Sequence, residues 1–342
     1  RTRGRARDEH RGVEEQVDEA HAGFIGRAPP SLESGASARH APRPGVGPRL
    51  AQEARPWDPL GRMADPRSSP ARRRRAGPVV NLVLTVLGAY AAFCALVWAA
   101  QRHLLFFPGG PPLRTPADAG LEYEEVELTT ADGMPLHAWW LPAAADGTGD
   151  EPRGAVLVFH GNAGNIEGRV PLARELVGLG LDVLLFDYRG YGNSGGSPSE
   201  KGLYLDGEAA HDWLTARMRE RGLPPQKLVY FGESLGGAVA VELANRRAPR
   251  ELGAIVLQST FTSVPDVARS VYWFLPVDLL ARDRFRTIDK LAGLTVPILV
   301  AHGRRDEIVP FAHAERILAA APHAERLELG GGHNDGGVLH SP

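Results

Sequence analysis

The feature that most constrains the fold is the segment 232–236, which lies between a short apolar run and a helical pattern. The run at 228–231 is apolar at every position, as in a buried parallel strand. The segment reads Gly-Glu-Ser-Leu-Gly, and its outer glycines leave room for a sharp turn. We therefore predict a strand-to-helix turn that lifts the hydroxyl of Ser234 above a sheet.

Similar apolar runs alternate with helical patterns along the second half of the chain. Two segments, 122–129 and 134–141, flank an Asp-Gly dipeptide that is typical of a hairpin. Further strands are predicted at 155–159, 182–186, 228–231, 254–257, 297–301 and 326–329, and helices at 170–179, 203–221, 236–247 and 312–321. The alternation predicts an α/β fold, a mostly parallel, doubly wound sheet with an N-terminal antiparallel hairpin.

A separate apolar stretch precedes this region. Residues 79–100 carry no charged side chain and are numerous enough to cross a hydrocarbon core of ~30 Å as a helix. We predict one transmembrane signal anchor at 78–101. Arginines at 72–75 place the N-terminus in the cytoplasm and the large domain outside it. A cleaved signal peptide, with a small-residue site at 89–91, is the alternative.

The anchor divides the chain into predicted regions. Residues 1–77 are basic, rich in Pro, Gly and Ser, and lack an apolar period, so we predict disorder. The chain begins with Arg, and Met63 opens a short basic segment before the anchor. We therefore hypothesise that Met63 is the true start and that the residues before it come from an over-extended reading frame. A linker is expected at 102–120 and the catalytic domain at 121–342.

Composition narrows the possible partners. The net charge of −2, with 23% charged residues, argues against a polyanionic partner such as nucleic acid. The single cysteine, Cys94, lies in the apolar stretch and excludes an intrachain disulfide or a cysteine-based metal site. No glycine cluster forms a phosphate-binding loop. We expect no cofactor and no metal, and the oligomeric state is not indicated.

A serine hydroxyl needs a base, and that base needs a carboxylate to orient it. Asp306 and His333 each follow a predicted strand, and His333 sits in a glycine-rich loop. With Ser234 they give the order Ser, Asp, His that is typical of one class of serine enzymes. Glu307 is the alternative orienting acid. Other downstream histidines lie in or beside a helical pattern or almost at the chain end: His313, His323 and His340.

Acyl transfer through a serine also needs two backbone donors where negative charge develops. The amide of Leu235, directly after the nucleophile, is one candidate. The second is expected from the segment 160–165, which follows a predicted strand. We favour the amide of Asn162, with Ala163 as the alternative, and interpret His160 as a structural residue of this loop.

Five segments together resemble a known family: 105–108 (Leu-Phe-Phe-Pro), 160–165 (His-Gly-Asn-Ala-Gly-Asn), 187–196 (Asp-Tyr-Arg-Gly-Tyr-Gly-Asn-Ser-Gly-Gly), 232–236, and 332–335 (Gly-His-Asn-Asp). They are similar to membrane-anchored α/β-hydrolases of the Bem46-like type, related to the ABHD12, ABHD13 and ABHD17 branches of animals. The resemblance implies an α/β-hydrolase fold and a triad of Ser234, Asp306 and His333.

The resemblance also implies a role for the 187–196 segment and for the chain end. That segment is expected to be structural, with Arg189 pairing locally and Asp187 holding the turn. Family members usually continue past the catalytic histidine into a final helix. This chain stops at Pro342, so we expect a C-terminal truncation.

By that resemblance, the predicted reaction is hydrolysis of a carboxylic ester or thioester of an acyl-chain small molecule or lipid, through an acyl-enzyme. An apolar insertion at about 261–286 fits either a small lid over an acyl chain or ordinary helices packed on the sheet. Two alternatives remain: a serine peptidase of the prolyl-oligopeptidase or aminopeptidase kind, and a non-catalytic membrane-bound binding protein.

Overall fold

The computed structural model describes residues 77–143, 152–247 and 251–334. Every described residue belongs to one compact unit, 74–342. The predicted disorder before residue 77, the Met63 start and the truncated end therefore lie outside the described residues.

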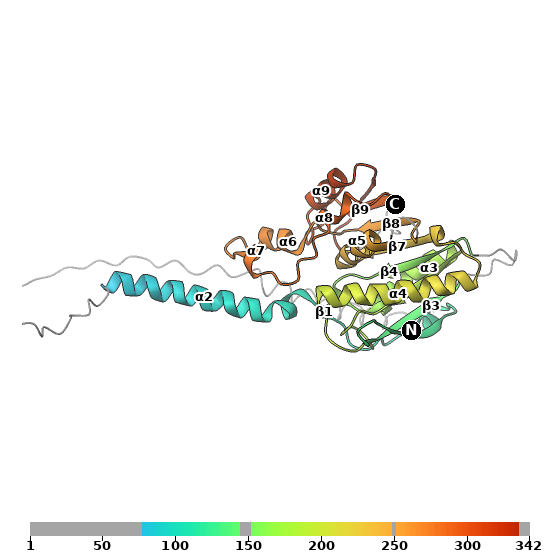
Figure 1. Ribbon diagram of the computed structural model, residues 1–342, viewed down its shortest axis with the longest axis horizontal. Coiled ribbons are helices and arrows are strands. Elements are labelled where there is room, and N and C mark those ends of the chain that lie inside the picture. Colours follow the sequence, from blue (N-terminus) through green and yellow to red (C-terminus); the bar gives the residue numbers. More distant parts are fainter. Residues whose placement is uncertain (1–76, 144–151, 248–250, 335–342) are drawn as a thin grey trace, which may run out of the picture. The chain divides into compact units, whose positions relative to one another are not determined.

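Helices and strands alternate along the described chain (Figure 1). The helices are α2 (Pro78–Leu105), α3 (Val170–Gly178), α4 (Glu200–Glu220), α5 (Leu235–Arg247), α6 (Val264–Val271), α7 (Val277–Leu280), α8 (Ile288–Leu291) and α9 (Ala312–Ala320), with short 3-10 turns at Pro116–Ala119, Ile166–Arg169 and Pro225–Lys227. The strands are β1 (Phe107–Pro108), β2 (Glu124–Thr129), β3 (Pro135–Leu141), β4 (Gly154–Phe159), β5 (Ala163–Gly164), β6 (Leu181–Phe186), β7 (Leu228–Glu233), β8 (Ala254–Gln258), β9 (Ile298–Gly303) and β10 (Glu325–Leu329).

The main sheet has eight strands in the order β10-β9-β8-β7-β4-β6-β3-β2. The hairpin β2–β3 is antiparallel, and β3 also pairs antiparallel with β6. The remaining neighbours are parallel. Gly133, in the hairpin turn, has a φ of 78°, which explains why an Asp-Gly pair occupies this turn. The predicted mixed sheet with an opening hairpin is confirmed.

Two hydrophobic cores lie on opposite faces of the sheet. Along β4, Ala155, Leu157 and Phe159 belong to one core, whereas Val156 and Val158 belong to the other. This alternation is the two-residue period of a strand, and all of β4 is buried as expected for a central parallel strand. Side chains of α4 and α5 join the first core, and side chains of α3 join the second.

Helix α2 is the one described helix that is long and apolar enough to cross a membrane, and an 18-residue window within it has a mean hydropathy of 2.2. None of its residues is buried. It continues to Leu105, beyond the predicted end at residue 101. The chain then enters the domain at once, because Phe106 is buried in the core and β1 pairs in parallel with β5.

Candidate active site

Ser234 occupies a tight turn between β7 and α5. Its φ of 49° lies in the left-handed region, which a serine adopts only when its surroundings enforce it. The glycines on either side allow the turn to pack. A Cβ at Gly236 would lie 1.9 Å from the carbonyl oxygen of Phe159, and a Cβ at Gly232 would lie 2.5 Å from the Cα of Gly237. The strand-turn-helix geometry predicted from the sequence is therefore present.

Three side chains from separate loops meet at this turn. The Nε2 atom of His333 lies 3.2 Å from the Oγ of Ser234, and its Nδ1 lies 2.8 Å from Oδ2 of Asp306. Asp306 follows β9 and His333 follows β10, so all three residues stand at the carboxyl ends of parallel strands. The carboxylate of Glu307 instead accepts a bond from the His333 backbone amide at 3.4 Å. Asp306, rather than Glu307, contacts the imidazole ring.

Asp306 is buried but well supplied with hydrogen-bond donors. Its Oδ1 accepts the amides of Ile308 at 3.1 Å and Val309 at 2.7 Å, and His302 Nε2 lies 3.3 Å from Oδ2. Burial alone would raise the pKa of Asp306, but His302, His333 and the Val309 amide together hold that pKa well below its usual range. A fixed negative charge therefore faces the Nδ1 side of the His333 ring.

Other histidines considered from the sequence have different surroundings. His313 lies in α9, where its Nδ1 is 2.9 Å from the hydroxyl of Thr262. His340 lies outside the described residues. Within residues 77–143, 152–247 and 251–334, no group of three or more His, Cys, Asp or Glu side chains could hold a metal ion.

Comparisons with known proteins identify the family and the fold. A family model described as "Serine aminopeptidase, S33" matches residues 150–282. An uncharacterized protein of Mycobacterium tuberculosis is 42% identical over 270 residues, covering 78% of this chain and 92% of the relative. The bem46 protein of Schizosaccharomyces pombe is 37% identical over 224 residues, covering 61% of this chain and 71% of the relative. An esterase of Pyrococcus furiosus has a TM-score of 0.55 at 24% identity, over 67% of this chain and 89% of that chain, which shows the shared fold.

The chain belongs to the Bem46-like α/β-hydrolases. The family resemblance and the α/β-hydrolase fold predicted from the sequence are thereby confirmed. The roles of individual site residues are inferred from their contacts in the structure.

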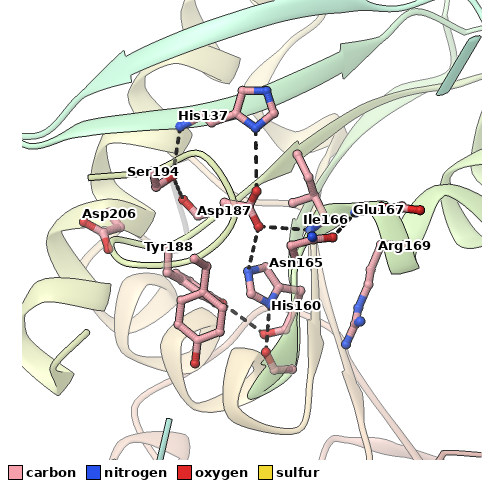
Figure 2. Close-up of polar contacts among 12 residues, drawn as sticks. His137, His160, Asn165, Ile166, Glu167, Arg169, Asp187, Tyr188, Ser194 and Asp206 are labelled. Atoms are coloured by element: carbon pink, nitrogen blue, oxygen red, sulfur yellow. Dashed lines mark hydrogen bonds and ion pairs between the residues drawn. The ribbon is translucent and has the colours of Figure 1, made fainter. Parts of the chain in front are cut away.

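In this Bem46-like hydrolase the second oxyanion donor is expected from the loop at 160–165. Several polar contacts hold this loop in place (Figure 2). His160 is buried, and its Nδ1 lies 2.8 Å from the carbonyl oxygen of Gly161. Burial, reinforced by the charge of Arg169, lowers the pKa of His160 to about 3. The ring is therefore neutral near pH 7, consistent with a structural residue.

Asp187 connects this loop to the 187–196 segment (Figure 2). Its Oδ1 accepts the amide of Ile166 at 2.9 Å and lies 3.7 Å from Nε2 of His160. Its Oδ2 lies 3.6 Å from Nδ1 of His137 on β3. Burial raises the pKa of Asp187 above its ordinary value. The side chain thus contacts both β3 and the end of the 160–165 loop, whereas within its own turn it is the carbonyl oxygen of Asp187 that accepts the Ser194 hydroxyl, at 2.7 Å.

The peptide unit that joins Asn162 to Ala163 is fixed by two contacts to its carbonyl oxygen. Its carbonyl oxygen accepts the hydroxyl of Tyr191 at 2.8 Å and the amide of Phe107 at 3.4 Å. Phe107 belongs to β1, directly after the apolar helix, and Tyr191 belongs to the 187–196 segment. Three of the segments that carry the family resemblance therefore meet at one peptide, a convergence that the linear sequence does not reveal.

An ion pair that sequence reasoning missed joins the 3-10 turn Ile166–Arg169, which follows the loop, to the nucleophile turn. Arg169 donates from Nε to Oε2 of Glu233 at 3.0 Å and from Nη2 to Oε1 at 2.8 Å. Glu233 directly precedes Ser234. A Cβ at Gly161 would come within 3.1 Å of Oε1 of Glu233, so the glycine allows the loop to lie against this pair. The available signal was a charged residue at the first variable position of the Gly-x-Ser-x-Gly motif.

The prediction that Arg189 pairs locally was wrong. Its guanidinium bonds to Asp132 in the β2–β3 turn at 2.8 and 3.0 Å, and to Asp206 in α4 at 2.8 Å. Both partners are distant in sequence. Arg189 is largely buried, and a buried guanidinium requires carboxylates on more than one side to compensate its lost hydration.

Proposed function

We propose that this chain is a serine hydrolase that cleaves carboxylic esters or thioesters of acyl-chain substrates. The observation that carries the proposal is the position of the His333 ring, with Asp306 at 2.8 Å on one nitrogen and Ser234 at 3.2 Å on the other. This is the arrangement of a nucleophile, a general base and an orienting carboxylate. The esterase fold neighbour and the hydrolase family support the same reaction class.

In the proposed mechanism, His333 takes the proton of Ser234 as the hydroxyl oxygen attacks the acyl carbonyl. Asp306 keeps the imidazole oriented and stabilises the imidazolium. The amides of Leu235 and Asn162 donate to the oxyanion of the tetrahedral intermediate. His333 then protonates the departing alcohol or thiol, and later activates the water that releases the acyl group from Ser234.

We further propose that α2 anchors the enzyme in a membrane as a single-pass helix. Its length, the mean hydropathy of 2.2 over an 18-residue window and its lack of buried residues support this role. The arginines at 72–75 favour a cytoplasmic N-terminus and an extracytoplasmic catalytic domain.

A serine peptidase is the second candidate, favoured by the description of the family model that matches residues 150–282. The two candidates separate in one assay with the full chain in detergent. We expect p-nitrophenyl esters, from acetate to laurate, to be hydrolysed far faster than aminoacyl p-nitroanilides, with no activity in Ser234→Ala. Faster cleavage of the anilides would replace the esterase proposal with the peptidase.

A further inference from the structure

The insertion between β8 and β9 contacts the apolar helix α2 along one stripe of that helix. Within α2, Cys94, Val97, Gln101 and Leu105 are partly covered, and their spacing of three or four residues places them on one face. By contrast, residues 78–93 are exposed. The domain therefore covers side chains in the second half of the helix, whereas the side chains of the first half, Tyr90 included, are exposed.

Polar contacts mark the end of this stripe that is nearer the catalytic domain. The side chain of Gln101 donates to the carbonyl oxygen of Leu280 at 3.2 Å and accepts the amide of Arg282 at 2.8 Å. Arg102 pairs with Asp283 at 3.2 Å. These groups form a polar belt of the kind expected where a membrane helix leaves the hydrocarbon.

A second contact lies much deeper along the same helix. The hydroxyl of Tyr90 donates to the carbonyl oxygen of Phe274 at 2.7 Å. Tyr90 precedes Gln101 by eleven residues, which corresponds to about 16 Å of helix at 1.5 Å per residue. One leaflet of a ~30 Å hydrocarbon core has about this thickness. The insertion thus follows α2 from the polar belt to about the middle of the predicted span.

The end of the insertion exposes large apolar side chains, which we call the apolar tip: Val271, Tyr272, Trp273, Phe274 and Leu279. Trp273 is 83% exposed and Leu279 is 81% exposed. Phe274, which contacts α2, is still 47% exposed. The rings of Tyr272 and Trp273 each contact that of Phe274, and Phe274 contacts Tyr90 of α2, so exposed apolar side chains gather beside the apolar helix. Exposed apolar groups gathered in this way mark an interaction site.

The polar groups near the apolar tip are largely paired within the protein. The amides of Leu275, Val277 and Leu279 bond to carbonyl oxygens of the same segment at 2.8 to 2.9 Å. The carbonyl oxygen of Phe274 has its donor in Tyr90. Irregular backbone tolerates a hydrocarbon environment only when such groups have partners.

The charge of Arg269, in α6 close to the apolar tip, is also paired within the protein. Arg269 makes two bonds to Asp278 at 3.1 and 3.0 Å, and a third to Asp266 at 2.9 Å. Pairing of this kind reduces the cost of bringing a guanidinium close to a low-dielectric medium.

We propose that the insertion is immersed in one leaflet of the bilayer, and that the acyl ester substrate reaches Ser234 laterally from that leaflet. The site is close in sequence: Thr260, whose hydroxyl donates to the carbonyl oxygen of Ser234 at 2.7 Å, lies just before α6. The substrate class is then a bilayer-resident acyl ester rather than a water-soluble one. The inference rests on the proposed hydrolase function and on α2 as the anchor.

Site-directed spin labelling tests the immersion. A nitroxide is placed at Trp273→Cys in a Cys94→Ala background, with the full chain in phosphatidylcholine vesicles. The matched control is Leu179→Cys, because Leu179 is an apolar residue that is 57% exposed outside the insertion. We expect the Trp273 label to collide more with oxygen than with a nickel chelate, and the Leu179 label to show the reverse. A Trp273 label open to nickel, or shielded from both reagents as under a protein partner, would overturn the inference.

An activity ratio tests the lateral route. The rate on 4-methylumbelliferyl palmitate held in phosphatidylcholine vesicles is divided by the rate on soluble p-nitrophenyl butyrate. We expect Trp273→Glu to lower this ratio by about tenfold or more, because an unpaired carboxylate resists entry into hydrocarbon. Leu179→Glu should leave the ratio unchanged.

The outcomes separate this inference from the proposed function. An unchanged ratio in Trp273→Glu would overturn the lateral route while leaving the hydrolase intact. No hydrolysis of either ester by the unaltered chain would overturn the proposed function and, with it, the lateral route. The spin-label result would still decide the immersion independently.

Discussion

The ion pair between Arg169 and Glu233 gives a prediction about catalysis rather than folding. Its two hydrogen bonds measure 3.0 and 2.8 Å, and the side chains are 16% and 28% exposed. A desolvated charged hydrogen bond contributes about 1.5–3 kcal/mol, whereas an exposed ion pair contributes about 0–1 kcal/mol. For this partly exposed pair we expect a coupling of about 1–2 kcal/mol, which is about 5- to 30-fold in a rate or equilibrium constant.

The pair links the 3-10 turn Ile166–Arg169, which directly follows the 160–165 loop, to the Ser234 turn, and we expect it to position that loop and the proposed Asn162 donor. Because oxyanion bonds strengthen in the transition state, its loss should lower kcat and leave KM nearly unchanged. Arg169→Gln and Glu233→Gln should each lower kcat by about tenfold, in line with a donor displaced rather than removed. The double variant should be no slower than the slower single variant.

The assay is steady-state hydrolysis of p-nitrophenyl butyrate by the wild type, both single variants and the double variant, with circular dichroism to confirm folding. The matched control is the cycle between Arg217 and Glu124, an ion pair of 2.6 Å that links α4 to the edge strand β2. Additive effects at the first pair, or an equal loss of kcat at the control pair, would refute the reasoning.

Further variants probe the orienting acid, the turn and the buried histidine. Asp306→Asn should lower kcat by about 10³- to 10⁴-fold through loss of the correct tautomer, with Glu307→Gln close to wild type in the same ester assay. Gly236→Ala should lose about 2 kcal/mol or more in thermal unfolding, because its Cβ would lie 1.9 Å from a backbone oxygen of β4, whereas Gly168→Ala meets nothing within 4 Å. His160, with a pKa of about 3 when folded, binds fewer protons than in the unfolded chain. The free energy of unfolding should therefore fall as pH drops from about 6.5 toward 3, and denaturant titrations of His160→Gln should show a slope smaller by up to about 1.4 kcal/mol per pH unit.

Much of the fold could be predicted because its signals are local. The central strands are short apolar runs, and β4 was expected at 155–159 and lies at Gly154–Phe159. The Ser234 turn was predictable for a related reason. A Cβ at Gly232 would clash with Gly237, and a Cβ at Gly236 would clash with Phe159 of the adjacent strand, so both positions require glycine. Periodicity and turn chemistry carry this kind of information.

Contacts between distant segments could not be predicted in the same way. The pairing of β1 with β5 involves two residues on each strand, too few for a periodic pattern. Arg169 finds Glu233, and Arg189 finds Asp132 and Asp206, only after the sheet has formed. Such partners depend on tertiary packing, and a single charged residue in the sequence does not specify which of many opposite charges it meets.

The measurement that tests the central claim most directly is fluorophosphonate labelling of the full chain, with peptide mapping of the modified residue. If His333 and Asp306 activate the hydroxyl of Ser234, that hydroxyl attacks the phosphorus of the probe. We predict a single adduct on Ser234, lost in Ser234→Ala and strongly slowed in His333→Ala. A folded protein that takes up no probe, or that carries the adduct on another residue, would contradict the account.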